Sequence, residues 1–204
     1  MRAFVAIHVD PTPAIRRLLS DLESLRGRGV WPVAPENLHM TLRFLGEIDE
    51  GRVPEITMAI RSAVMGHTTF GIGLRGLGTF PGRGRPRVLW IGVDQPEGAL
   101  TALAEDIIAG LATVGFDAED FTPHLTVARL KGGRAAGRIR WMIDGYGDTV
   151  FGVQQVSEVR LMRSILTPQG AIYDIVGRAV LGSAMDGGAL EFDGPLDTGP
   201  DPSM

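Results

Sequence analysis

The sequence contains no cysteine among its 204 residues. Disulfide bonds, thiolate zinc sites and a cysteine nucleophile are therefore excluded. The chain also lacks an apolar run of membrane-spanning length, and its start, MRAFVAIHVD, resembles a strand rather than a signal peptide. We therefore expect a cytoplasmic protein that does not associate with membranes.

Acidic and basic residues nearly balance over most of the chain, so neither sign of charge is in excess there. The net charge is −4, but five of the 24 acidic residues follow Leu181, where there is no Lys or Arg. The basic residues form two local groups that either attract phosphates or are solvated loop charges. They are Arg83, Arg85 and Arg87, and Arg129, Lys131, Arg134, Arg138 and Arg140. We expect residues 1–181 to form one bilobal domain and residues 182–204, rich in Gly, Pro and Asp, to be a disordered acidic tail.

Hydrophobic spacing predicts alternating strands and helices. Strands are expected over residues 2–9, 38–45, 70–77, 88–93, 121–130, 151–162 and 171–181. Helices are expected from about residue 15 to Gly27, from 53 to Gly66 with Asp49 as its cap, from 100 to Gly115, and over 135–143.

The two halves of this pattern share a register. A shift of 85 residues carries His39 onto His124 and Thr41 onto Thr126, and it also superimposes the apolar positions of the first and third helices. We interpret this as an internal duplication of a strand–helix–strand–helix–strand unit. It predicts two α+β lobes related by a pseudo-two-fold axis, each built on a sheet.

Each repeated strand presents a histidine and a threonine on one face. Alternate residues of a strand share a face, so His39 lies with Thr41, and His124 with Thr126. If the lobes pack about the predicted axis, both pairs line one groove. Two histidines can act there as acid and base on a phosphodiester, with hydroxyls donating to its oxygens and without a metal.

A single His-x-Thr pattern is weak evidence for a catalytic site. The sequence contains a further copy, His67 with Thr69, at the end of a predicted helix and without a partner at the repeat spacing. We interpret that copy as structural, and His8, at the end of the first strand, likewise.

The series of motifs resembles a known family. ENLHMTLRFLGE and FTPHLTVARL look like its two HXTX motifs at 39–42 and 124–127, MRAFVAI like its opening strand, GTFPGRGRPRVLW like its connecting loop, and LMRSILTPQGAIY like its closing signature. The chain is thus similar, over residues 1–181, to the RNA 2′,3′-cyclic phosphodiesterases of the 2H phosphoesterase superfamily, once described as 2′-5′ RNA ligases.

This resemblance implies a bilobal α+β fold of antiparallel-rich sheets with a central groove, and no metal or cofactor. It implies hydrolysis of an RNA 2′,3′-cyclic phosphate end to a 2′-phosphomonoester, with His39 as proton donor and His124 as proton acceptor. Thr41, Thr126 and Arg129 would bind the phosphate. Strict alternation places Arg129 on the face opposite His124, so it needs a bulge, a twist or the end of the strand to reach the groove. Arg43 has the right parity, with less support from the family pattern.

Other conspicuous residues have plainer interpretations. The tryptophans, Trp31, Trp90 and Trp141, are expected to pack in the core or between lobes. Phe80, in a Gly/Pro loop, is a candidate for stacking on a base. Ser164 and Tyr173 match the closing signature and are expected to be structural.

Two alternatives remain open. On the same fold, the groove could carry out 2′-5′ RNA ligation, or cleave 2′-5′ linked oligonucleotides or a small cyclic nucleotide. A different class, a non-catalytic module that binds RNA ends, is disfavoured by the intact His and Thr pairs. The chain is expected to act as a monomer on RNA.

Overall fold

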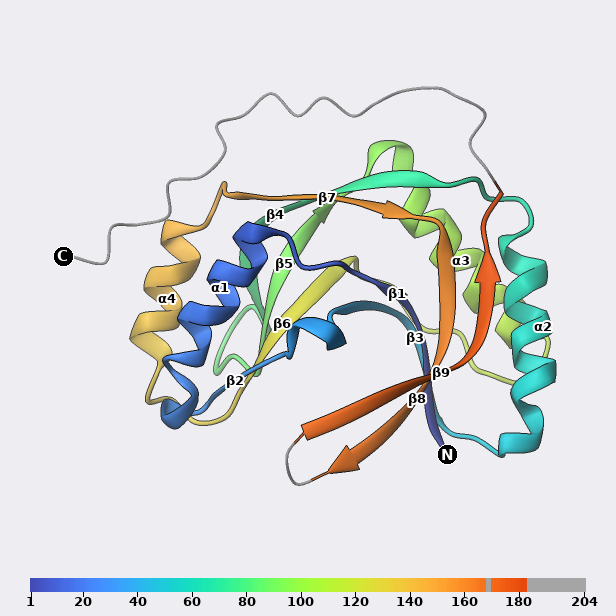
Figure 1. Cartoon of the computed structure of the whole chain (residues 1–204), viewed down its shortest axis with the longest axis horizontal. Helices are drawn as coiled ribbons and strands as arrows, with labels where there is room; N and C mark the ends of the chain where they lie inside the picture. Colours follow the sequence, from blue (N-terminus) through green and yellow to red (C-terminus); the bar gives the residue numbers. More distant parts are fainter. Residues whose placement is uncertain (168–169, 183–204) are drawn as a thin grey trace.

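The computed structural model describes residues 1–167 and 170–182. Within these two ranges the chain forms nine strands in two antiparallel sheets and four α-helices (Figure 1). None of the helices in this part is long and apolar enough to cross a membrane. The tail predicted for 182–204 lies outside the described residues except for Gly182.

The strands divide between two sheets whose order does not follow the sequence. Sheet A has the order β3 (His39–Glu47), β1 (Arg2–His8), β8 (Glu158–Thr167) and β9 (Gly170–Val180). Sheet B has the order β2 (Val30–Pro32), β6 (His124–Leu130), β5 (Val88–Asp94), β4 (Phe70–Phe80) and β7 (Val150–Val156). The helices are α1 (Pro13–Glu23), α2 (Val53–Val64), α3 (Ala99–Ala112) and α4 (Ala136–Gly145). The predicted α+β class with two antiparallel sheets is confirmed.

Helices α1 and α3 each pack away from the sheet that contains the strand before them. Helix α1 follows β1 of sheet A but packs against β2 and β7 of sheet B, where the Thr12 hydroxyl donates to the carbonyl of Phe151 at 2.5 Å. Helix α3 follows β5 of sheet B but packs against β3 and α2. Helices α1 and α4 therefore lie together at one end of the molecule and α2 and α3 at the other (Figure 1). The two crossings tie the lobes together.

Local sequence explains where the helices begin. Thr12 caps α1 by accepting a hydrogen bond from the Ile15 amide at 3.2 Å, and Pro13 occupies the first turn. Asp49 caps a short 3₁₀ helix, Glu50–Arg52, that leads into α2, so it acts one element earlier than predicted. Helix α1 ends at Glu23, before the predicted stop at Gly27. Residues 26–28 do not continue the α-helix and form a separate 3₁₀ helix.

Two predicted strands differ in their limits. The run expected over 151–162 is two strands in different sheets: Val156 pairs with Phe70 of β4, whereas Glu158 pairs with Val180 of β9. Periodicity does not reveal this change of partner, because side chains keep alternating through it. Strand β6 begins at His124 rather than near 121, and the short edge strand β2 has no counterpart among the predictions.

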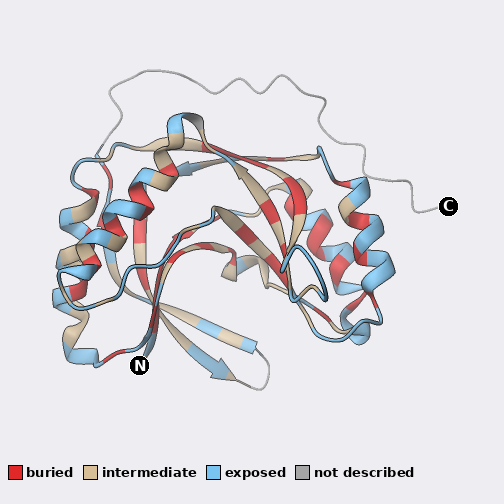
Figure 2. Ribbon diagram, turned by 180° about the vertical axis from the view of Figure 1, so that it is seen from behind, coloured by how far each residue is buried: buried red, intermediate tan, exposed pale blue. Residues whose placement is uncertain are grey.

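One face of each histidine strand is buried, and the other faces the space between the sheets. Met40 and Leu42 of β3, and Leu125 and Val127 of β6, belong to a core cluster that runs through both lobes. The helices turn their buried sides toward the sheets, as Figure 2 shows. The opposite faces of β3 and β6 remain partly accessible. The predicted alternation is confirmed over residues 39–42 and 124–127, but not beyond them: Phe44, expected on the face of Met40 and Leu42, is exposed.

Candidate active site

A cavity of about 600 Å³ lies between the two sheets. Its walls come from β1, β3, β8 and β9 on one side and from β6, the end of β4 and residues 119–122 on the other. All five residues predicted as site residues line it: His39, Thr41, His124, Thr126 and Arg129. The structure thus gathers residues that lie up to 90 positions apart in the sequence around one cleft.

Both histidines are held by the same local bond. The Nδ1–H of His39 donates to the Asn37 carbonyl at 2.6 Å, and the Nδ1–H of His124 donates to the Thr122 carbonyl at 2.7 Å. Because a carbonyl only accepts, each ring carries its proton on Nδ1 when neutral. In both rings Nε2 is then the atom that accepts or donates the mobile proton.

The pKa of the His39 imidazole is lower than its ordinary value. Burial lowers the pKa of the His39 imidazole below 6.5, and the positive charges of Arg129, His8 and His124 lower it further, against the opposing effect of the Asn37 carbonyl. The free protein therefore favours a neutral His39. An anion bound among these cations would oppose the part of the lowering that comes from their charge and so raise the pKa of His39.

A bulge brings Arg129 to the cleft. Trp90 of β5 pairs with Thr126, but the next residue, Leu89, pairs with Ala128, so Val127 is an extra residue in β6. Both Val127 and Ala128 are buried in the core. The alternation is thereby reset, and Arg129 returns to the face of His124. Of the three expected routes to the groove, a bulge, a twist or the strand end, the structure has the bulge.

Strand β3 has a bulge at the matching place, where Phe44 takes the position equivalent to Arg129, and the nearby Arg43 is otherwise engaged. Ala6 of β1 pairs with Thr41 and Val5 with Arg43, which leaves Leu42 extra. The Arg43 guanidinium lines the cleft, forms an ion pair with Glu119 and donates to the Asp117 carbonyl at 2.6 Å. Arg129 has no carboxylate partner among the described residues. Arg129 is therefore the more available of the two for an anion.

Aromatic rings support the two histidines, among them Tyr173, which was expected to be structural, and Phe80, the candidate for stacking on a base. The His39 ring lies 4.9 Å from the Phe4 ring and 5.1 Å from that of Tyr173, between centroids. The His124 ring meets Phe80 edge-on at 5.0 Å, and Phe80 packs on Trp90 at 5.3 Å. Tyr173 and Ser164 also line the cleft. Their places in the closing signature were the signal that could have predicted this.

The other two histidines lie outside the cleft. The Nε2 of His67 contacts Asp106 of α3 at 2.8 Å, in agreement with a structural role. His8 is the cross-strand neighbour of His39 and contacts Asp10 at 3.3 Å. His8 thus lies next to the cleft without lining it.

The tryptophans do not all pack as predicted. Trp31 on the edge strand β2 is 45% exposed, and Trp141 on α4 is 38% exposed with the Arg138 guanidinium 3.9 Å from its ring. Of the three, only Trp90 packs between β4 and β6, where its ring contacts Phe80, which lines the cleft. The prediction of interior packing is wrong for Trp31 and Trp141, because a single exposed aromatic looks the same as a buried one in a short strand or amphipathic helix.

Among residues 1–167 and 170–182, no three His, Asp or Glu side chains are grouped as metal ligands would be. The cleft instead offers two imidazoles with fixed tautomers, two hydroxyls and the guanidinium of Arg129. Such a set can hold a phosphate group and move protons on either side of it.

Comparison with known sequences finds one family across most of the chain. The sequence profile of the 2′-5′ RNA ligase superfamily matches residues 10–164. A protein of Archaeoglobus fulgidus named RNA 2′,3′-cyclic phosphodiesterase is 40% identical over 176 residues, 85% of this chain and 96% of that protein. A protein of the same name from Aeropyrum pernix is 43% identical over 143 residues, 69% of this chain and 80% of that protein.

Solved structures share the fold. TT0787 of Thermus thermophilus superimposes with a TM-score of 0.69 at 30% identity, over 90% of this chain and 99% of that one. LigT of E. coli complexed with 3′-AMP superimposes with a TM-score of 0.65 at 25% identity, over 88% of this chain and 97% of that one.

Proposed function

The chain belongs to the 2′-5′ RNA ligase superfamily, and on that basis we propose that it is a hydrolase that opens RNA 2′,3′-cyclic phosphate ends to 2′-phosphomonoesters. The observation that carries the proposal is the symmetric pair of histidines, each held through Nδ1 by a carbonyl two residues earlier in one shared cleft. The names of the relatives in Archaeoglobus and Aeropyrum support the substrate.

The reaction assigns one proton transfer to each histidine. The Nε2 of neutral His124 accepts a proton from a water molecule as its oxygen attacks phosphorus. The bond from phosphorus to the 3′-oxygen breaks, and the Nε2–H of protonated His39 gives its proton to that oxygen. The product carries a 2′-phosphate and a free 3′-hydroxyl. Each histidine ends in the protonation state that the other began with, so a proton exchange with solvent resets the site.

The phosphate is held by groups from both lobes. The Thr41 and Thr126 hydroxyls donate to its non-bridging oxygens, and the Arg129 guanidinium contacts the same group. Burial is the main cause that lowers the pKa of His39 in the free protein, and the anion offsets the positive charge of Arg129, which lowers it further. Substrate binding thereby favours the protonated His39 that the reaction needs.

The product of an RNA ending in a 2′,3′-cyclic phosphate tests this proposal. We expect a 2′-phosphomonoester, identified by ³¹P NMR and by its resistance to a 3′-specific phosphatase, formed at the same rate with and without EDTA. A 3′-phosphate, or loss of turnover on chelation, would contradict the proposal. Adding a second RNA with a 5′-hydroxyl tests the alternative reaction, because attack by that hydroxyl would give a 2′-5′ linkage. The monomeric state and the cytoplasmic location stay predictions, which light scattering and cell fractionation test.

A further inference from the structure

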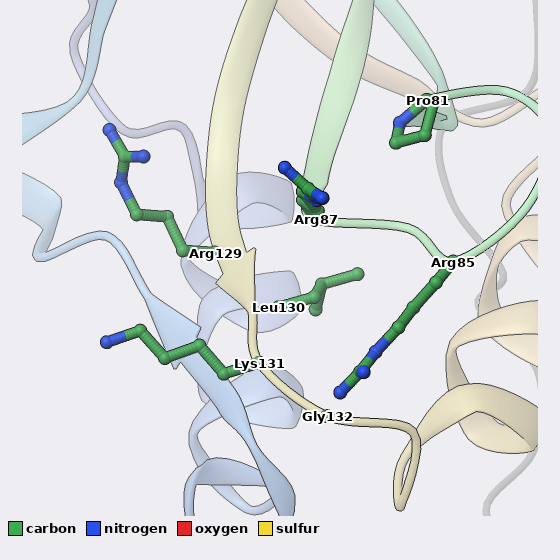
Figure 3. Close-up of a pocket in the computed structure, with 7 residues that line it drawn as sticks. All are labelled: Pro81, Arg85, Arg87, Arg129, Leu130, Lys131 and Gly132. Carbon is green, nitrogen blue, oxygen red and sulfur yellow. The ribbon is translucent and has the colours of Figure 1, made fainter.

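A second hollow adjoins the cleft where β5 begins and β6 ends. Its volume is about 720 Å³, and four of the seven residues that line it are cationic, namely Arg85, Arg87, Arg129 and Lys131. None of these seven described residues is acidic. Figure 3 shows the cations distributed over the loop before β5 and the end of β6. A wall of this composition attracts phosphate groups.

These cations are not neutralised by carboxylates of the described part of the protein. Arginines elsewhere pair with carboxylates, as Arg52 does with Glu55 and Arg163 with Asp174. Among the described residues, no carboxylate forms such a pair with any of the four cations of the hollow. Arg85 instead extends toward Gly132, where its guanidinium lies 3.4 Å from the position that a Cβ would take (Figure 3). The hollow is therefore a concentration of uncompensated positive charge.

Arg129 connects the hollow to the active-site cleft, because it lines both. A phosphate bound between His39 and His124 would therefore lie beside a residue that also lines the basic hollow. Lys131 follows two residues later in the chain, and its side chain projects from the same side as that of Arg129 (Figure 3). A polynucleotide that leaves the cleft past Arg129 would meet Lys131 next.

An exposed aromatic ring lies beside these two cations. Trp31 of β2 is the cross-strand partner of Arg129, so the two side chains share a face of sheet B. The Lys131 Nζ lies 5.3 Å from the centre of the Trp31 ring, and the Arg26 guanidinium lies 5.7 Å from it. An indole among cations at a sheet edge offers a stacking surface for a base beside contacts for its phosphates.

We propose that Trp31, Arg85, Arg87 and Lys131 form a subsite, the distal RNA site, that binds the strand on the 5′ side of the cyclic phosphate. The cations hold backbone phosphates and Trp31 stacks on a base. The inference rests on the proposed function for the position of the reacting end. Its consequence is that the protein hydrolyses an RNA chain more efficiently than a cyclic mononucleotide, although both substrates carry the same 2′,3′-cyclic phosphate.

The test compares two substrates in two charge-matched double variants. The substrates are adenosine 2′,3′-cyclic phosphate and an eight-nucleotide RNA with the same terminus. The variant Arg85→Gln/Lys131→Gln alters the distal RNA site, whereas Arg61→Gln/Arg140→Gln removes two charges on α2 and α4 that line neither the hollow nor the cleft. In the wild type we expect kcat/KM to be about tenfold or more higher for the RNA. That ratio should fall about tenfold in the first variant and not in the control. An equal ratio in all three proteins would overturn the proposal.

Salt dependence provides a second measurement that needs no variant. Each phosphate contact with single-stranded RNA adds about −0.7 to the slope of log K against log salt. The slope for binding the eight-nucleotide product, labelled at its 5′ end, should therefore be steeper by about 1.4 or more than the slope for adenosine 2′-phosphate. Equal slopes would overturn the distal RNA site even if a variant fails to fold. If the wild type hydrolyses neither substrate, the proposed function fails, and the binding slopes still decide the distal site on their own.

Discussion

The imidazoles of His39 and His124 are oriented by equivalent hydrogen bonds in equivalent strands. Each Nδ1–H donates to the carbonyl two residues earlier, at 2.6 and 2.7 Å, and each ring lines the same cavity. Because the accepting carbonyl lies in the segment that leads into each strand, neither imidazole needs a carboxylate to orient it. Two equivalent strands therefore place two histidines of the same tautomer in one cleft, each with Nε2 as the atom that exchanges a proton.

Replacing either histidine should abolish most of the turnover without unfolding the chain. We expect His39→Ala and His124→Ala each to lower kcat by about 100- to 10,000-fold on an RNA 2′,3′-cyclic phosphate, because each removes one proton transfer. Steady-state kinetics measures the effect, with circular dichroism as the check on folding. His67→Ala is the matched control, since His67 belongs to an identical His-x-Thr sequence outside the cleft and should keep wild-type turnover. Wild-type turnover in either cleft variant would remove that histidine from the reaction.

The pH dependence should report the lowered pKa of His39. As the proton donor, His39 must be protonated, so kcat/KM falls as pH rises through its pKa in the free protein, which burial and then the charge of Arg129 lower below 6.5. Arg129→Gln removes one of these causes and should move this limb of the kcat/KM profile to higher pH, while also weakening phosphate binding. NMR titration of the His39 ring gives the same shift directly. A limb that stays in place, or moves to lower pH, would contradict the assignment of His39 as the acid.

The threonine hydroxyls should matter mainly for turnover. Thr41→Val and Thr126→Val keep the shape and burial of the side chain but remove a donor to the phosphate oxygens, so we expect kcat to fall by about 100-fold in each. Thr69→Val, in the His-x-Thr copy outside the cleft, is the control. If the two cleft variants changed KM alone, the hydroxyls would bind the ground state and not the transition state.

Much of this arrangement could be predicted from the sequence, because it follows from local periodicity. Alternation in β3 and β6 predicted that the His and Thr pairs face the cleft, and the parity of Arg129 showed that a bulge, a twist or the strand end was needed, of which the structure has a bulge at Val127. The crossing of α1 to sheet B could not be predicted, because an amphipathic helix shows which face it buries but not against which sheet. The capture of Arg43 by Glu119 depends on a contact 76 residues away, and the exposure of Trp31 depends on an edge strand three residues long.

Gly78 is a position where the fold depends on a missing side chain. It pairs across β4 and β5 with Trp90, and a Cβ on Gly78 would lie 2.2 Å from two atoms of the indole. Gly78→Ala should displace Trp90 and with it Phe80, which supports His124. We expect a loss of about 1–3 kcal/mol in the free energy of unfolding, measured by urea denaturation, together with reduced turnover. Gly66→Ala, where nothing lies within 4 Å, is the control, and equal stability of the two variants would show that the indole is not confined.

The sharing of one phosphate by two imidazoles can be measured in solution. With ¹⁵N-labelled histidine, the chain gives only four ring systems, and the 2′-phosphorylated product can be titrated into the protein while their Nε2 signals are followed. The account predicts that the signals of His39 and His124 move together, with one Kd and one equivalent of ligand, and that those of His67 stay in place. If only one of the two cleft histidines responded, or if they responded with different affinities, the two rings would not act on the same phosphorus atom.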